Sequence, residues 1–144
     1  MSKLAAFAAL AIATTALALP AIGSAGNGGK TAYAPKDCTK PRVEPGRIVV
    51  TCGDGNFYVK MKHWASFNGK EATGKGKAHI NSCDPDCASG TFQTFAVKVH
   101  LTKPKLTKCG GRKVPLFSKI EIDFKDQPPT GLSDSEKFPL FCNP

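Results

Sequence analysis

The residues with the widest chemical potential in this chain are its six cysteines. Thiols can hold zinc, carry out redox chemistry or form disulfide bonds. Zinc sites usually combine two tight Cys or His pairs, whereas Cys83-x-x-x-Cys87 is the one tight pair here, and no Cys-x-x-Cys redox motif is present. An even cysteine count in a short exported chain is typical of disulfides. We therefore expect disulfides, with no metal and no cofactor, at Cys38, Cys52, Cys83, Cys87, Cys109 and Cys142.

The pairing of these cysteines is open at the level of sequence, because six cysteines can be joined in many ways. Proximity along the chain ranks sequential pairing first. In that arrangement one bond closes a loop ahead of a strand, one pins a tight turn and one ties down the tail. The three pairs would be Cys38 with Cys52, Cys83 with Cys87, and Cys109 with Cys142.

A concentration of basic residues between positions 98 and 119 is the second chemical feature. The chain carries 20 Lys+Arg against 11 Asp+Glu, a formal net charge of +9. Such a stretch could bind anionic envelope polymers, acidic lipid headgroups or nucleic acid, and the last is the least expected partner of an exported chain. The alternative is a solvated surface with Trp64 packed beneath a loop. The predicted binding residues are Lys98, His100, Lys103, Lys105 and Trp64.

Other polar motifs favour turns over sites. Gly53-Asp54-Gly55-Asn56 and the group formed by Asn81, Asp84 and Asp86 could offer oxygens to calcium, but neither has the ligand spacing of a calcium loop. The histidines lie singly on separate segments, no Gly-x-Ser-x-Gly motif is present, and the carboxylates are scattered. The sequence therefore predicts a protein that is not an enzyme.

The first residues have the layout of a secretory signal peptide. Lys3 precedes the uncharged run Leu4 to Leu19, Pro20 interrupts it, and Gly23-Ser24-Ala25 supplies small residues for cleavage. The apolar run is short for a spanning helix, which needs about 20 residues. We therefore predict a signal peptide at 1–25, no transmembrane anchor, and a secreted or cell-wall-associated protein.

The elements that must position these residues are β-strands. Ile48 to Thr51 is β-branched throughout, the Gly-Asp-Gly-Asn motif follows, and Phe57 to Phe67 alternates, which together predict a β-hairpin. Thr91 to Leu101 and Leu116 to Phe124 also alternate between apolar and polar residues. We expect a flexible arm at 26–37 and one stapled all-β domain at 38–144, built as a sandwich or barrel-like fold with an irregular tail.

Two motifs together resemble a group of uncharacterised small secreted actinobacterial proteins. They are Cys52-Gly53-Asp54-Gly55-Asn56, followed by Trp64, and Asn81-x-Cys83-x-Pro85-x-Cys87-Ala88-x-Gly90-x-Phe92. The resemblance covers about residues 38 to 124, implies export and supports the first two disulfide pairs. It implies no established activity. The chain departs from the pattern in having Phe67 where a second Trp is frequent, more Lys, and an added pair in Cys109 and Cys142.

Two functional hypotheses follow. In the first, the protein binds an anionic or carbohydrate surface of the cell envelope through its basic residues. In the second, it is a secreted effector or inhibitor that binds another protein through a rigid loop such as Asp84-Pro85-Asp86. The sequence does not fix the oligomeric state.

Overall fold

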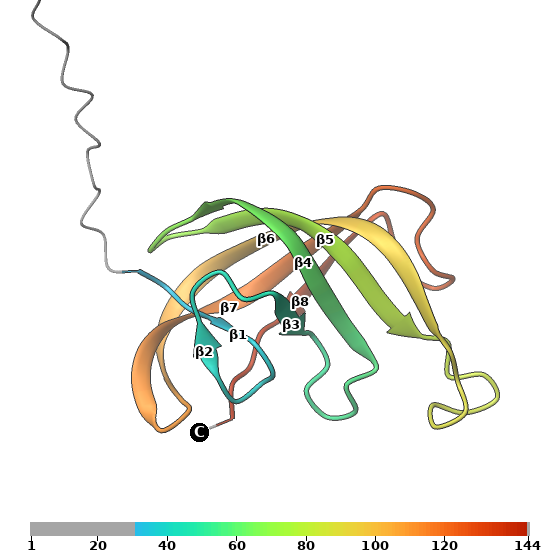
Figure 1. Cartoon of the computed structure of the whole chain (residues 1–144), viewed down its shortest axis with the longest axis horizontal. Helices are drawn as coiled ribbons and strands as arrows, with labels where there is room; N and C mark the ends of the chain where they lie inside the picture. Colours follow the sequence, from blue (N-terminus) through green and yellow to red (C-terminus); the bar gives the residue numbers. More distant parts are fainter. Residues whose placement is uncertain (1–30, 144) are drawn as a thin grey trace, which may run out of the picture.

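The computed structural model of the chain describes residues 31–143, so the predicted signal peptide at 1–25 and the start of the predicted arm lie outside the described residues. Within that range all regular structure is β, which confirms the all-β prediction (Figure 1). The strands are β1 Ala34–Pro35, β2 Pro41–Arg42, β3 Arg47–Val49, β4 Phe57–Phe67, β5 Ala72–Asn81, β6 Phe92–Cys109, β7 Arg112–Phe124 and β8 Ser135–Pro139.

Strands β3 to β8 form one six-stranded antiparallel sheet in chain order, and β1 and β2 form a small second sheet. The large sheet is strongly curved in Figure 1, and its buried face encloses the core. The Phe57 ring on β4 contacts the Phe138 ring on β8 at a centroid distance of 5.2 Å. In the described range, β3 and β8 are the two edge strands of the large sheet. The two ends of the sheet are therefore joined by side-chain contacts and not by backbone hydrogen bonds between strands.

The N-terminal arm differs from the sequence-based prediction. Ala32 and Ala34 are fully buried. Tyr33 donates a backbone hydrogen bond to Pro115 (2.8 Å) and accepts one from Phe117 (2.9 Å) on β7. The expected flexible arm at 26–37 is therefore wrong for residues 32–35. A two-residue strand is too short to show periodicity, which is why the sequence pattern does not mark it.

The cysteines are joined in the sequential pairs that proximity ranks first: Cys38–Cys52, Cys83–Cys87 and Cys109–Cys142. In the chain-entropy model the first bond, with a sequence separation of 14, stabilises the fold by about 3 kcal/mol. The third spans 33 residues and contributes about 4 kcal/mol.

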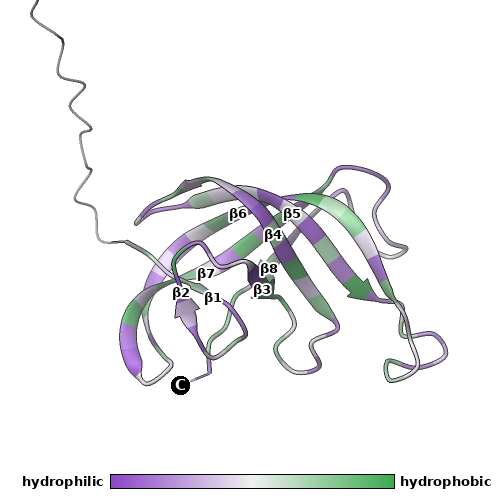
Figure 2. Cartoon of the chain, in the orientation of Figure 1, coloured by the Kyte–Doolittle hydropathy of each residue, from purple (hydrophilic) through white to green (hydrophobic). Residues whose placement is uncertain are grey.

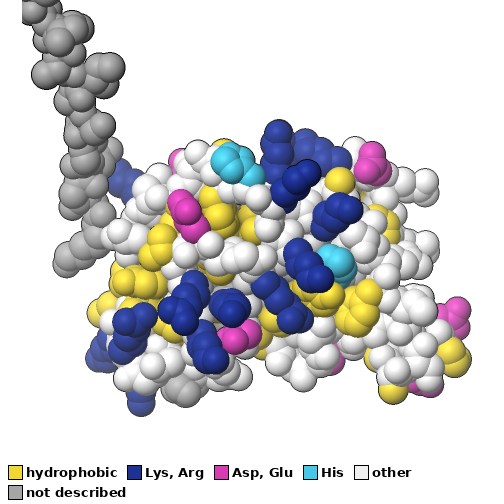
Figure 3. Space-filling model, in the orientation of Figure 1, with side chains coloured by type: hydrophobic (Ala, Val, Ile, Leu, Met, Phe, Trp, Pro, Cys, Tyr) yellow, Lys and Arg dark blue, Asp and Glu magenta, His cyan; other side chains and the backbone are white. Residues whose placement is uncertain are grey.

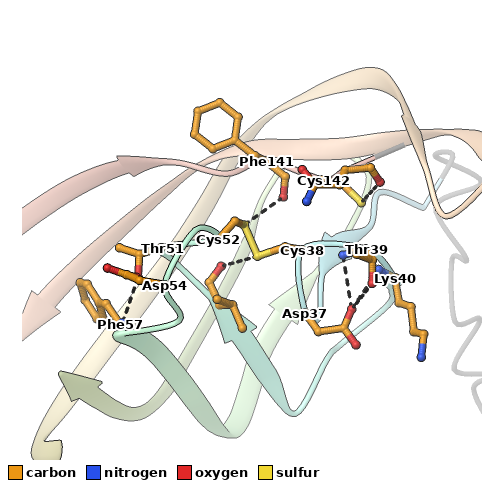
Figure 4. The surroundings of a disulfide bond; sticks show 12 residues. Asp37, Cys38, Thr39, Lys40, Thr51, Cys52, Asp54, Phe57, Phe141 and Cys142 are labelled. Carbon is orange, nitrogen blue, oxygen red and sulfur yellow. Dashed lines mark hydrogen bonds between the residues drawn. A yellow bond between two sulfur atoms is a disulfide. The ribbon is translucent and has the colours of Figure 1, made fainter. Parts of the chain in front are cut away.

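Two of these bonds lie where the N-terminal segment of the described residues meets the C-terminal tail, near the start of the large sheet. Figure 4 shows the Cys52 sulfur next to the Phe141 carbonyl oxygen, at 3.9 Å, and Cys142 lies beside it. Asn143 donates a 2.7 Å backbone hydrogen bond to Cys38. The last residues of the tail are thus held against the N-terminal segment. The prediction of an irregular tail is wrong for Ser135–Pro139, which pairs with β7 as strand β8.

Strand β4 alternates as predicted only as far as Met61. Two β-bulges follow, between Met61 and His63 and between Trp64 and Ser66. Each bulge adds a residue and reverses which face the next side chains occupy. His63 and Ala65, which strict alternation places with the apolar residues, are exposed. The apolar side chains that β4 directs into or against the core are therefore Phe57, Val59, Met61, Trp64 and Phe67.

Two glycines on β5 make room for these bulges. A Cβ at Gly74 would lie 2.6 Å from the His63 carbonyl oxygen and 2.7 Å from the Met61 methyl carbon. A Cβ at Gly76 would overlap the Lys60 carbonyl oxygen. Since backbone atoms cannot swing aside as a flexible side chain can, the close approach of β4 to β5 requires glycine at both positions.

We predict that Gly76→Ala destabilises the protein by about 1–3 kcal/mol, because the added methyl group meets backbone. Gly53→Ala is the matched control, since a Cβ there meets nothing within 4 Å. Urea unfolding of the oxidised protein measures both. Equal stability of Gly76→Ala and the wild type would contradict the close approach.

Candidate functional site

The face of the sheet that points away from the core, here called the outer face, carries most of the polar side chains of β4 and β5. Figure 2 shows this alternation as purple and green segments along both strands. Paired residues on neighbouring antiparallel strands project to the same side. The register therefore places on the outer face of β3 to β6 the charged, histidine and tyrosine side chains of Arg47, Tyr58, Lys60, His63, Lys75, Lys77, His79, Lys98 and His100.

Cations on the outer face lie directly opposite one another across the strands. Lys60 is paired with Arg47 on one side and with Lys77 on the other. Lys75 is paired in the same way with Lys98. Figure 3 shows Lys and Arg side chains in a band across the face over β4 and β5. Like charges in directly opposed positions destabilise a sheet, so this arrangement is unfavourable for folding alone.

Carboxylates do little to neutralise the row formed by Arg47, Lys60 and Lys77. In residues 31–143 the ion pairs are His100–Glu71 at 3.1 Å and Lys137–Glu121 at 3.3 Å. Neither involves the three cations of the row. The positive potential there is consequently unscreened by the protein itself.

Aromatic stacking holds part of this row in place. The Arg47 guanidinium carbon lies 4.0 Å from the centre of the Tyr58 ring. The His79 ring is stacked on Tyr58 at 4.7 Å with an interplanar angle of 7°. A guanidinium over an aromatic face is attracted to the ring. Arg47 and His79 are therefore held on the two sides of one tyrosine.

Burial and the neighbouring cations act together on His79. Desolvation is the largest cause that lowers the pKa of His79 below its ordinary value of 6.5. The positive charges of Lys60, Lys77 and Arg47 lower this pKa further. Both effects favour the neutral imidazole of His79 over the imidazolium.

A shallow groove of about 380 Å³ lies next to this row on the outer face. Lys75, Lys98 and His100 line it, together with Asp123. Lys125 contributes a further charge, and its pKa is lowered by desolvation and by Lys98 and Lys75, whereas Asp123 acts to raise it. A second depression, of about 230 Å³, is lined by Thr102, Lys103, Lys119, Ile120, Glu121 and Lys137.

The five predicted binding residues separate in the structure. Lys98 and His100 line the groove, and Lys103 lines the second depression. Lys105 is exposed but lies seven residues from Lys98, or about 23 Å along an extended strand. Trp64 lies on the opposite side of the sheet, packed against the core. The basic part of the prediction is thus partly brought together, and its aromatic residue is misplaced.

Trp64 has a structural role. Its ring meets Phe67 edge-to-face at 5.0 Å, and its indole N–H donates to the Pro45 carbonyl at 3.3 Å. The expectation that Trp64 lies on the polar face of its strand is therefore wrong. The bulge between Met61 and His63 shifts Trp64 from the polar to the apolar face.

Sequence reasoning missed Arg47, Lys60, Lys77 and His79 because they come from three separate strands and lie outside the basic stretch at 98–119. A signal was present in β5, where Lys75, Lys77 and His79 alternate with glycine and alanine. Small residues at the alternate positions concealed the period that bulky apolar residues make obvious.

The polar motifs at 53–56 and 81–90 form turns. Asp54 accepts a hydrogen bond from the Asn56 amide at 3.0 Å, and this bond is the largest cause that lowers the pKa of Asp54. Asp86 accepts from the Ala88 and Ser89 amides at 2.9 and 2.8 Å. The Ser89 amide is the main cause that lowers the Asp86 pKa. Backbone amides therefore already engage both carboxylates.

Two further observations concern the described range alone. Residues 31–143 contain no cluster of three or more His, Cys, Asp or Glu side chains with the geometry to hold a metal ion. No helix in that range could cross a membrane.

Comparison of the chain with protein-family models, curated proteins and solved structures gives no match. The resemblance to small secreted actinobacterial proteins accordingly stays a prediction.

We predict that Trp64→Ala lowers the free energy of unfolding by about 2–4 kcal/mol, because it leaves a cavity against the core. The folded fraction should bind polyanions with unchanged affinity, since Trp64 does not reach the outer face. Thermal unfolding and binding titrations below the transition measure the two effects. If Trp64→Ala greatly weakened polyanion binding without changing the free energy of unfolding, Trp64 would have to contact the polyanion directly.

Proposed function

We propose that this protein is a secreted, non-enzymatic binding protein for an anionic polymer of the cell envelope, which it contacts with its outer face. The signal-peptide layout from Lys3 to Ala25 supports export. Three disulfides in a small domain fit an oxidising compartment. The net charge of +9 favours an anionic partner.

The proposal rests on two pairs of lysines that lie directly opposite each other on neighbouring strands. They are Lys60 with Lys77 and Lys75 with Lys98. Like charges in directly opposed positions cost stability that neutral residues would not. An anion between two such amines converts the repulsion into attraction. The arrangement is therefore understood best as one that favours a bound anionic partner.

The spacing of the cations favours a polymer over a small ion. Neighbouring strands lie about 4.8 Å apart, and outer-face residues such as Lys75 and Lys77 repeat about every 6.6 Å along a strand. The cations thus form a grid over several strands. The groove beside them is open and shallow, which suits an extended chain with repeated charges.

Replacing Lys60, Lys77 and Lys98 together with glutamine should weaken binding to dextran sulfate by about a hundredfold at low salt, since a cation near an anionic surface contributes about 1 kcal/mol. The same change removes like-charge pairs, so stability should stay equal or rise slightly. Titration calorimetry and urea unfolding measure the two quantities. Neutral dextran should not bind.

The matched control replaces Lys36, Lys40 and Lys70, which are exposed lysines outside the sheet strands, with glutamine. It has the same net charge as the outer-face variant. Equal losses in both triple variants would show that overall charge, and not the outer face, attracts the polymer. Failure of the wild type to bind any anionic polymer at low salt would refute the proposed function.

A second candidate function is binding of another protein through the loop that joins β5 and β6. The Cys83–Cys87 bond closes this loop, and its residues 84–89 are exposed. Asn81 donates to the Asn56 side chain at 2.9 Å and to the Cys87 carbonyl at 2.8 Å. An exposed loop held in one conformation loses little entropy on binding, which is the property that rigid inhibitor loops use.

The two candidates differ in their response to salt. Polyanion binding falls steeply as salt rises, whereas a protein interface with an apolar centre keeps most of its affinity. Affinity capture from the producer's secretome on the immobilised protein separates them. The loop is favoured if a captured protein stays bound at high salt and is not captured by Pro85→Ala. The outer face is favoured if the captured material is released at high salt.

A further inference from the structure

The row of stacked side chains on the outer face has a property that charge alone does not explain. Tyr58 separates two groups, the Arg47 guanidinium at 4.0 Å and the His79 ring at 4.7 Å, and both of its ring faces are engaged by the protein. A ligand ring cannot stack on a tyrosine covered on both faces. The exposed Phe92 ring flanks this stack, 5.4 Å from the Tyr58 ring. The polar groups that the row offers to a ligand are the guanidinium, the phenol oxygen and the imidazole nitrogens.

We propose that these edges form one discrete oxyanion site, which takes a single sulfate or phosphate group, and that His79 gains a proton from solvent when that group binds. The inference rests on the proposed function, because the oxyanion would be one charged group of the polymer. The cationic side chains of the site are Arg47, Lys60, Lys77 and His79.

Geometry favours a compact oxyanion. Lys60 and Lys77 are directly opposed on neighbouring strands, and His79 follows Lys77 on the same face of β5. Arg47 reaches the row from β3, which pairs Arg47 with Lys60. Guanidinium and ammonium groups on three neighbouring strands can together contact the several oxygens of one sulfate or phosphate group of the polymer.

The charges that face His79 come from every strand of this row and have one sign. Lys60 acts from β4, Lys77 from β5 and Arg47 from β3. Thr94 on β6 is neutral, with its hydroxyl oxygen 3.4 Å from His79 Nδ1. A bound oxyanion would offset these positive charges and favour the imidazolium.

The direction of the pH effect follows from linkage. The pKa of free His79 lies below 6.5 because of desolvation and the three cations. If the bound oxyanion raises this pKa, affinity increases as pH falls through the pKa of the complex and levels off below the pKa of the free protein. Well above the pKa of the complex, affinity does not change with pH.

Dextran sulfate and inorganic sulfate are the probes, because neither changes its charge between pH 5 and 8. Calorimetry should show dextran sulfate binding about fivefold or more tighter at pH 5.5 than at pH 8, within the usual range of coupling. The NMR titration of the His79 ring should shift to higher pH when inorganic sulfate is added. His79→Gln should remove the pH dependence of affinity.

His63→Gln is the matched control, since His63 is exposed and pairs with Lys75 outside the stacked row. It should keep the pH dependence. Tyr58→Phe should keep most of the affinity because the stack persists. Tyr58→Leu has the same net charge but should lose several-fold in affinity, because Arg47 and His79 are no longer held.

The outcomes separate the two proposals. The oxyanion site is overturned if His79→Gln binds dextran sulfate with the same pH dependence as the wild type, and if sulfate leaves the His79 titration of the wild type unmoved. The proposed function would still stand after that result. A His79 titration moved by inorganic sulfate without any polymer binding supports the site and refutes the polymer as its source. Tyr58→Leu and Tyr58→Phe with equal affinities would overturn the role of the stack.

Discussion

The approach of β4 to β5 through two glycines decides which side chains of β4 this protein buries and which it displays. At Gly74 and Gly76 the β4 backbone lies too near for any Cβ. The bulges that fit there turn Trp64 inward beside Met61 and leave His63 outside. Without that shift, strict alternation would expose Trp64. The faces occupied by the β4 side chains beyond Met61 depend on this steric constraint.

The cationic face is supported by a fold that is stabilised by disulfides. Repulsion across Lys60–Lys77 and Lys75–Lys98 costs a fraction of a kcal/mol to about 1 kcal/mol per pair. The disulfides Cys38–Cys52 and Cys109–Cys142 each contribute several times that amount by restricting the unfolded chain. The first of these bonds lies beside the stacked row, since the Cys38 sulfur is 4.0 Å from the carbonyl oxygen of Val49, the register partner of Tyr58. The disulfides therefore offset the cost of the like-charged pairs.

Much of the fold could be predicted from sequence, because local patterns specify strands and turns. The hairpin from Arg47 to Phe67 and the alternating start of β6 follow from neighbours in the chain, whereas proximity ranks the observed disulfide pairing first without fixing it. The buried position of Ala34 and the bulges of β4 could not be predicted, since they depend on contacts with distant strands.

The candidate site was harder to predict than the fold. Lys98 and His100 were recognisable within a basic stretch, but their neighbours Lys75 and Lys77 belong to another strand. Register, which a single sequence does not specify, aligns Lys60 with Lys77 and Tyr58 with His79. A binding surface assembled across strands becomes visible only when the pairing of those strands is known.

The most direct test of the central claim is to map the contact surface by NMR during titration with dextran sulfate at low salt. The account predicts that side-chain signals of Arg47, Lys60, Lys77 and His79 shift, whereas the indole N–H of Trp64 and the methyl group of Met61 do not. Shifts centred on Trp64 and Met61, with the outer-face signals unmoved, would contradict the assignment of the binding face.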